Sequence, residues 1–517
     1  MKRKTSRDIL SALILLSSVI VTSSAQALSL DTDKIDKAIN GAIAPFTDTF
    51  SNFIFYPITI AGQELPWIVV WLATAAIGFT LYFRFINFRG FGLAIRIVRG
   101  DYTKKSDAGE VSHFQALTAA LSGTVGLGNI AGVGVAISLG GPGATFWMIL
   151  VGLFSMTSKF AECTLGVKYR EIDEHGVVSG GPMYYLKKGL AEKGLPRLGA
   201  ILATIFAICC ILGAFGAGNI FQVSQSLSQI KLVTGGQESF LHNNGWIYGV
   251  AVSIFVGVVI IGGIRSIASV TSKLVPFMCG IYMLAAFGVL FADFSQIPAA
   301  FNAIIKGAFA PEASIGGVIA VMIQGMRRAT FSNEAGIGSA AIAHSAVKTE
   351  EPVTEGLVAL LEPFIDTVVV CTTTALVIII TGAYLSGDAS GIVLTSNAFT
   401  SVYPSFDKAL AVIAFLFAIS TTITWAYYGQ KSWNFLFGDN KIIDITYKLI
   451  FCAVAIIGST MPLGKIVDFG DAALFSMAIP NIIGVVILAP VVKQEINSYL
   501  ERIKSGEIAP VTAEDKG

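Results

Sequence analysis

The chain has 517 residues, of which 54% are hydrophobic and only 13% are charged, and its mean hydropathy is +0.71. Soluble domains carry about 25% charged residues, so this composition excludes an ordinary soluble protein and indicates a polytopic, all-α membrane protein. The net charge of +1 says nothing of nucleic acid, and no basic stretch is interleaved with aromatic residues, so we expect no nucleic-acid partner. The six cysteines and four histidines show neither disulfide nor metal-site spacing.

The N-terminus has the three parts of a secretory signal peptide. Basic residues at 2–4 precede an apolar run from Ile9 to Val21 and a small-residue site at Ala25–Ala27. We expect residues 1–27 to be a signal peptide; the alternative is an uncleaved first helix. In both cases residues 28–65 form a periplasmic segment. It carries an amphipathic run that we expect on the membrane surface, formed by Ile35, Ile39, Ile43 and Phe46.

Apolar runs of about 20 residues predict eleven transmembrane helices. They lie near 66–84, 112–137, 142–168, 198–220, 246–266, 271–293, 313–346, 355–383, 405–428, 443–462 and 470–492. Lys and Arg gather in the loops of one side and are sparse on the other. This asymmetry predicts a mature N-terminus outside the bacterial inner membrane and a cytoplasmic C-terminus, with residues 493–517 as a cytoplasmic tail.

The predicted helix near 112–137 is interrupted by glycines, each of which costs about 1 kcal/mol of helix stability relative to Ala. They are Gly123, Gly126, Gly128 and Gly132. Backbone groups freed inside a bilayer must find partners, so the segment is either packed closely against a neighbour or unwound around a ligand. The polar residues Ser122, Thr124 and Asn129 favour unwinding.

A second interrupted helix follows near 313–346, which is too long for one simple span. We expect two half-helices joined near Phe331 to Glu334. Interrupted helices at corresponding places in two halves of a chain indicate an inverted-repeat transporter. The ten helices after the first would then form a 5+5 inverted repeat within a transporter domain at 66–492. Repeat one spans 112–293 and repeat two spans 313–492.

Several motifs resemble those of the alanine/glycine:cation symporters over residues 66 to about 495. They are Gly-Asn-Ile-Ala-Gly-Val (128–133), Leu-Gly-Gly-Pro-Gly-Ala (139–144), Gly-Gly-Pro-Met-Tyr-Tyr-Leu (180–186), Phe-Ser-Asn-Glu-Ala-Gly-Ile-Gly-Ser-Ala (331–340) and Ala-His-Ser-Ala-Val-Lys-Thr (343–349). The resemblance implies a leucine-transporter-like fold and sodium-coupled uptake of small neutral amino acids. The segment Val125 to Asn129 also resembles the unwound first helix of the neurotransmitter:sodium symporters. The signal-like extension departs from many members of the family, which begin at the first span.

An amino-acid zwitterion needs donors for its carboxylate and acceptors for its ammonium group. We assign the carboxylate to the amides at a half-helix N-terminus, with Thr124, and the ammonium group to carbonyls of the second break. The resemblance adds Gln222, for which the alternative is a polar helix end in water. Trp425 is expected to limit the substrate side chain to a hydrogen or a methyl, or else to belong to an interfacial aromatic belt. The substrate-site candidates are Thr124, Gly126, Leu127, Gly128, Asn129, Gln222, Phe331, Ser332, Asn333, Thr421 and Trp425.

A cluster of hydroxyls between Ser420 and Thr424 suits a sodium ion, which prefers several hard oxygen ligands. The resemblance places this helix against the first broken helix. The expected sodium ligands are therefore Ser122, Val125, Asn129, Ser420 and Thr421. The alternative is that each hydroxyl bonds back to a carbonyl of its own helix.

Charged residues also fall inside the predicted helices. Arg327 and Arg328 need a vestibule or a carboxylate as partner, for which Glu334, Asp468 and Asp471 are candidates. Two further pairs share helix faces, and we interpret them as a structural ion network on the inner half, with a proton or gating role as the alternative. They are Lys159 with Glu162, and Glu362 with Asp366.

The function predicted from these features is secondary active transport. The substrates would be L- or D-alanine and glycine, with sodium as the coupling ion, no cofactor and the lipid bilayer as surroundings. Coupling to protons is the nearest alternative, and a channel is a second. No nucleophile–base or metal constellation indicates an enzyme.

Overall fold

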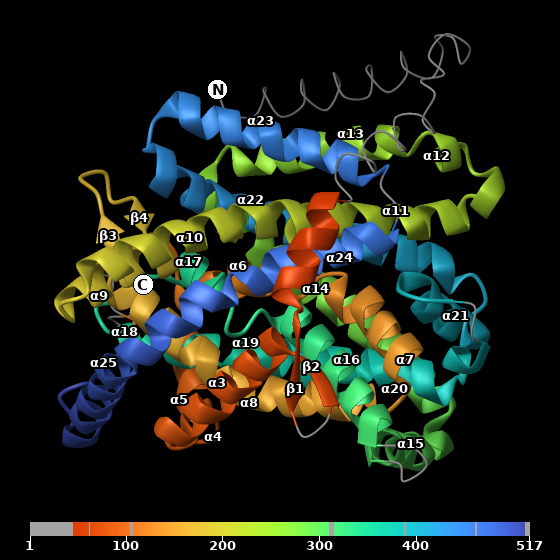
Figure 1. The fold of residues 1–517 in the computed structure, drawn as a ribbon, viewed down its shortest axis with the longest axis horizontal. Helices are drawn as coiled ribbons and strands as arrows, with labels where there is room; N and C mark the ends of the chain where they lie inside the picture. The colour runs from red at the N-terminus through yellow and green to blue at the C-terminus, as the bar shows by residue number, and fades with distance from the viewer. Residues whose placement is uncertain are drawn as a thin grey trace. The chain divides into compact units, whose positions relative to one another are not determined.

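The computed structural model describes residues 45–60, 63–103, 107–309, 315–386, 389–460 and 463–511. Most of these residues are helical (Figure 1). In the described part, six helices are long and apolar enough to cross a membrane, or seven if one bent pair counts as a span. The expected helical membrane protein is thus confirmed, while the number of eleven spans stays a prediction. The predicted signal peptide and Ile35, Ile39 and Ile43 lie outside the described residues.

The first half of the described chain holds two antiparallel pairs of short strands, β1–β2 and β3–β4, and a succession of helices. These elements are β1 (Pro57–Ile60), β2 (Gln63–Pro66), α3 (Trp67–Tyr82), α4 (Ile86–Arg89), α5 (Phe91–Val98), α6 (His113–Thr124), η1 (Gly128–Gly132), α7 (Val133–Gly140), α8 (Ala144–Lys168), β3 (Glu171–Ile172), β4 (Val178–Ser179), α9 (Pro182–Glu192), α10 (Pro196–Phe215), η2 (Gly216–Ile220), α11 (Phe221–Val233), η3 (Gly236–Glu238), α12 (Phe240–Asn243), α13 (Gly245–Ile260), α14 (Gly263–Ala292), η4 (Phe294–Gln296) and α15 (Ile297–Phe309).

The second half repeats the pattern of long helices joined by short ones. Its elements are α16 (Ile315–Asn333), α17 (Ala340–His344), α18 (Pro352–Ala359), α19 (Leu361–Pro363), η5 (Phe364–Cys371), α20 (Thr372–Ile380), η6 (Ala383–Ser386), α21 (Ile392–Val402), α22 (Phe406–Phe437), α23 (Lys441–Gly458), α24 (Leu463–Ser476) and α25 (Ala478–Ser505). In Figure 1, α13 and α23 lie side by side at one edge, and α10 runs along α22.

The first predicted break is present. Helix α6 ends at Thr124, and after a short unwound segment the chain resumes as η1 and α7, with a bend of 50° between the two parts. The amide of Val125 still bonds to the carbonyl of Leu121, but the next two amides leave the helical pattern. The glycine-rich sequence is therefore unwound, as its composition predicts.

The second break lies a few residues later than predicted. Helix α16 continues through Asn333, and the unwound joint runs from Glu334 to Ser339. The Asn333 side chain explains this end, because its Oδ1 accepts the amide of Ala335 at 3.0 Å and replaces the next helical acceptor. Glu334 then takes a left-handed conformation with φ of 55°, which a helix cannot continue.

Two predicted helix ends also shift. The run near 198–220 continues as α10, η2 and α11 to Val233, and two glutamines of α11 are buried against α21. Gln225 Oε1 accepts the amide of Ile392 at 3.4 Å, and Gln229 Nε2 donates to Ser396 Oγ at 3.1 Å. At the C-terminus, α25 runs on to Ser505, so the first part of the predicted tail is helical.

Candidate substrate and cation site

The two broken helices meet at their breaks. A Cβ placed on Gly128 would lie 3.4 Å from Ser332 Cα, so the backbones of η1 and α16 are nearly in contact. A Cβ on Gly126 would collide with Thr421 Oγ1 of α22. The close approach of Thr421 requires glycine at position 126, whereas a Cβ at position 128 would make an ordinary van der Waals contact. The two sequence-predicted breaks are therefore brought together at one buried point.

Side chains hold the amides of the first break. Gly126 N donates to Asn129 Oδ1 at 2.9 Å, and Leu127 N donates to Gln222 Oε1 at 3.2 Å. Gln222 is only 3% exposed, so its alternative interpretation as a helix end in water is wrong. The amides proposed for a carboxylate thus already meet an oxygen acceptor, as expected of freed donors at the start of a helix.

Asn129 joins the first break to η5. Its Nδ2 donates to Asp366 Oδ1 at 2.6 Å and lies 3.3 Å from Cys371 Sγ. Asp366 Oδ2 in turn accepts from Thr367 Oγ1 at 2.7 Å, and Thr367 Oγ1 accepts from Asn333 Nδ2 at 3.0 Å. This fully buried carboxylate was assigned to an inner ion network, and that assignment is wrong: it supports the site instead.

The last turn of α16 presents carbonyls to the site. Among the hydrogen bonds of the described residues, none uses the carbonyls of Phe331 and Ser332, because Ala335 N turns to the Asn333 side chain. The Phe331 ring packs edge-on against Phe221 at 5.0 Å between centroids. Two polar carbonyls beside an aromatic wall are suited to an ammonium group on an apolar carbon.

The hydroxyl cluster of α22 divides into two kinds. Ser420 Oγ and Thr422 Oγ1 bond to carbonyls of their own helix, at 3.0 and 2.8 Å, as the alternative interpretation predicts. Thr124 Oγ1 of α6 does the same with longer contacts of 3.4 Å. Thr424 Oγ1 instead crosses to the carbonyl of Ala119 at 3.2 Å.

Thr421 is the exception in this cluster. Its hydroxyl is buried, has no hydrogen-bond partner among the described residues, and faces Gly126 in the unwound segment. Nearby, Ser122 Oγ donates to the carbonyl of Ser420 at 2.8 Å, which ties α6 to α22. The carbonyls of Ser122 and Val125 have lost their helical donors at the break. An unpaired hydroxyl beside freed carbonyls is a set of ligands for a hard cation.

Trp425 lies one turn further along α22. It is 1% exposed, so the interfacial-belt alternative is wrong. Its Nε1 donates to Glu334 Oε1 at 2.9 Å, and Ser339 Oγ donates to Glu334 Oε2 at 2.5 Å. The indole packs on Tyr428 and so closely on Gly218 that a Cβ there would collide with it. The ring is fixed between the second break and η2.

The sequence model of the sodium:alanine symporter family matches residues 48–514. The chain belongs to this family. The symporter is a multi-pass membrane protein and a transporter, not an enzyme. It is 38% identical over 440 residues to the sodium/alanine symporter AgcS of Methanococcus maripaludis, covering 84% of this chain and 94% of that protein. It is 33% identical over 451 residues to the probable sodium/glutamine symporter GlnT of Bacillus subtilis, covering 86% and 91%.

Among solved structures, the symporter resembles MhsT in complex with L-phenylalanine. The TM-score is 0.54 at 16% sequence identity, with 75% of this chain and 98% of that chain covered. The likeness confirms the leucine-transporter-like fold that the sequence motifs implied.

A pair of arginines of the symporter lies on the other side of the second break. Arg327 and Arg328 both pair with Asp471 of α24, and the Arg327 Nε to Asp471 Oδ2 distance is 2.8 Å. Arg327 also lies over the Phe55 ring at 4.0 Å, and Arg328 over the Phe331 ring at 5.1 Å. Asp471, one of the three candidate carboxylates, therefore binds both arginines, and the Arg328 guanidinium lies next to the substrate-site candidate Phe331.

Proposed function

We propose that this chain is a sodium-coupled symporter that carries small neutral amino acids, L- or D-alanine and glycine, into the cell. The observation that carries the proposal is the meeting of two helix breaks. Freed amides, freed carbonyls and the unpaired Thr421 hydroxyl surround one buried point between them. Donors, acceptors and hard oxygens are the groups that a zwitterion and a cation need.

In the proposed substrate complex, the amides of the first break hold the carboxylate. Gln222 Oε1 now accepts from Leu127 N, and the substrate carboxylate would replace it as the acceptor. Gln222 Nε2 donates one hydrogen to the carbonyl of Ala217 at 3.1 Å, and its second hydrogen would donate to the carboxylate. The carbonyls of Phe331 and Ser332 would accept from the ammonium group. Trp425 is held rigidly by Glu334, which makes it suited to limit the size of the substrate side chain.

The proposed sodium site uses the Thr421 hydroxyl with the carbonyls of Ser122 and Val125. Ser420 contributes by its position, since its hydroxyl bonds within α22 and its carbonyl holds Ser122. Asn129 would act indirectly and not as a sodium ligand, because its side chain holds the unwound segment that supplies the carbonyls. Substrate and cation would thus share one segment of backbone, which gives a direct physical basis for coupling.

The proposed architecture is eleven spans, ten of them in a 5+5 inverted repeat, in the bacterial inner membrane with the C-terminus in the cytoplasm. Three features support it. Each half contains a broken helix followed by a long helix, and a short helix, α9 or α21, lies before the next long helix. Alternating access would then rock the two broken helices against the rest of the bundle.

Uptake into proteoliposomes tests the proposal. Radiolabelled alanine should accumulate with a sodium gradient and not with a potassium gradient of the same size. A neutral amino acid with one sodium ion carries net charge, so each 100 mV, inside negative, adds about 2.3 kcal/mol, or roughly 50-fold in accumulation. Accumulation driven by a proton gradient without sodium would refute sodium coupling, and equilibration without accumulation would indicate a channel.

A further inference from the structure

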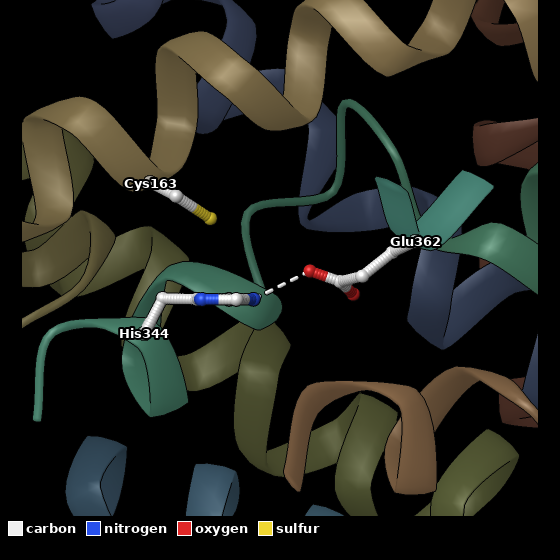
Figure 2. A group of neighbouring side chains, drawn as sticks. All are labelled: Cys163, His344 and Glu362. Carbon is white, nitrogen blue, oxygen red and sulfur yellow. Dashed lines mark hydrogen bonds and ion pairs between the residues drawn. The ribbon is translucent and has the colours of Figure 1, made fainter. Parts of the chain in front are cut away.

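A continuous chain of buried titratable groups lies on the α6–α17 side of the candidate site. His113 of α6 bonds to Glu355 of α18, and Glu355 Oε1 contacts His344 Nδ1 of α17 at 2.5 Å. His344 Nε2 contacts Glu362 Oε1 at 2.5 Å, and Lys159 Nζ of α8 lies 3.3 Å from Glu362 Oε2. All five side chains are at most 2% exposed. Figure 2 shows His344 with its ring directed at Glu362.

The contacts among these five side chains require one more proton than two neutral histidines supply. A short contact between an imidazole nitrogen and a carboxylate oxygen needs one proton between the two atoms. The contacts of His113 and His344 with Glu355 and Glu362 are three in number. Two neutral imidazoles beside two ionised carboxylates bring only two protons. One extra proton is therefore held in the chain, and His344, with a carboxylate at each nitrogen, is its natural place.

The charge balance leads to the same count. Glu355 and Glu362 carry two negative charges, and Lys159 carries one positive charge. Only with the extra proton is the buried set neutral, and an uncompensated buried charge is costly. The other titratable groups that face the chain include Glu162 and Cys163 of α8, Glu334 of the second break, Asp366 of η5, Tyr428 of α22 and Arg170 after α8.

These neighbours are engaged elsewhere. Glu162 Oε1 accepts from Asn481 Nδ2 at 2.6 Å and does not pair with Lys159, contrary to the expected pair. Arg170 donates to backbone carbonyls, including those of Ser345 and Val347 at 2.8 and 2.6 Å. The extra proton is therefore not replaced by a neighbouring cation.

A metal ion is the other ligand that these groups suggest. The ligand atoms of Cys163, His344 and Glu362 lie within 4.8 Å of one another (Figure 2). However, both ring nitrogens of His344 already contact carboxylate oxygens, and a metal ion could bind only after one of those contacts is broken. The geometry fits a proton better than a metal ion.

The chain is also tied to the ends of both broken helices. His113 is the first residue of α6, directly after the exposed residue Ser112. The strand-like residue Val111 pairs with Val347, just beyond α17. His113 Nε2 has no partner among the described residues and is buried. Any outward movement of the start of α6 would break the bond from His113 to Glu355 and expose this nitrogen to water.

We propose that the chain His113–Glu355–His344–Glu362–Lys159 is a proton-binding site that closes the inner side of the transporter. Its proton exchanges with the cytoplasm through His113 when the start of α6 moves away. The site holds the two broken helices together when it is protonated. When the proton is lost, the two carboxylates repel each other, and the inner side cannot close again until a proton returns. The gating part of this inference rests on the proposed alternating access; the proton count does not.

Nitrogen NMR of ¹⁵N-histidine-labelled protein tests the proton count directly, because the whole protein has only four histidines. An ordinary histidine is neutral at pH 8. Wild-type protein in detergent should keep one imidazolium signal at pH 8, and that signal should be missing in His344→Gln. His175→Asn, in an exposed loop, is the matched control and should keep it. Four neutral histidines at pH 8 in the folded wild-type protein would overturn the proposal.

Uptake into proteoliposomes tests the gating. With a fixed sodium gradient and external pH, initial alanine uptake should fall about tenfold per unit of internal pH once the proton becomes limiting. His113→Asn should flatten this dependence, and His175→Asn should not. The same internal-pH profile in wild type and His113→Asn would overturn the gating role. Absence of sodium-driven uptake at every pH would instead refute the proposed function and leave the NMR result standing.

Discussion

Replacement of Asn129 by alanine separates a functional role from a packing role at the first break. The Asn129 side chain bonds both ways: its Oδ1 accepts Gly126 N at 2.9 Å, and its Nδ2 donates to Asp366 Oδ1 at 2.6 Å. Alanine removes both bonds and leaves a backbone amide and a carboxylate buried without these partners. The unwound segment then loses the side-chain hydrogen bonds that connect it to η5.

The size of the effect follows from the two bonds. A hydrogen bond to a charged group contributes about 1.5–3 kcal/mol, and a buried amide left unpaired costs about 1–3 kcal/mol. Together the broken-helix conformation should lose about 2.5–6 kcal/mol. Domains are stable by about 5–15 kcal/mol, so the variant should still fold while the site geometry becomes poorly populated. Sodium-dependent uptake should fall at least about sixtyfold, since 1.4 kcal/mol corresponds to a factor of ten.

The assay compares initial sodium-driven alanine uptake at equal amounts of reconstituted protein. Asn397→Ala is the matched control, because that asparagine is exposed on α21. Size-exclusion chromatography and the thermal unfolding midpoint verify that each variant is folded. If folded Asn129→Ala transports alanine at the wild-type rate with unchanged sodium dependence, Asn129 is only a packing residue, and the reasoning from its two bonds is wrong.

Three further predictions address the substrate, the cation and the N-terminus. Trp425→Leu should let valine or leucine compete with alanine while sodium dependence stays intact; no competition would place the size limit elsewhere. Thr421→Ala should weaken apparent sodium affinity about tenfold or more with unchanged size selectivity, since it removes one of few hard ligands; an unchanged sodium titration would contradict the cation site. Mass spectrometry of the purified protein should find Leu28 as the first residue, and an intact Met1 would refute cleavage.

The long apolar runs and the first break could be predicted from sequence because they depend on local composition. Glycines at 126 and 128 lower helix stability in any surroundings. Inside a bilayer the backbone groups that they free must find other partners, so an unwound segment there is expected to bind a ligand or pack closely. The second break was misplaced by a few residues for a local reason too. An asparagine such as Asn333 is found both inside helices and at their ends. Only the folded structure shows that the Ala335 amide donates to the Asn333 side chain, which ends the helix there.

Asp366 was misassigned because sequence spacing assumes a regular α-helix. Asp366 is four positions after Glu362, so in an α-helix both side chains would lie on one face. The chain instead widens into the π-helix η5 from Phe364, and each turn then contains an additional residue. Glu362 therefore faces His344, whereas Asp366 faces Asn129. A change of register within one helix separates an ion network from a substrate site, and apolar periodicity does not reveal it.

The buried histidine–carboxylate chain shows a different limit of sequence reasoning. His113 and Glu355 are 242 residues apart, and each of the four histidines stands alone in the sequence. A solitary histidine in an apolar run gives no sign of its partners. Once the fold brings His344 between two carboxylates and His113 against one of them, the number of protons is fixed by the number of contacts. The charge of Lys159 then fixes how many protons leave the set neutral. The two counts agree on one proton, and neither count depends on knowing which substrate the transporter carries.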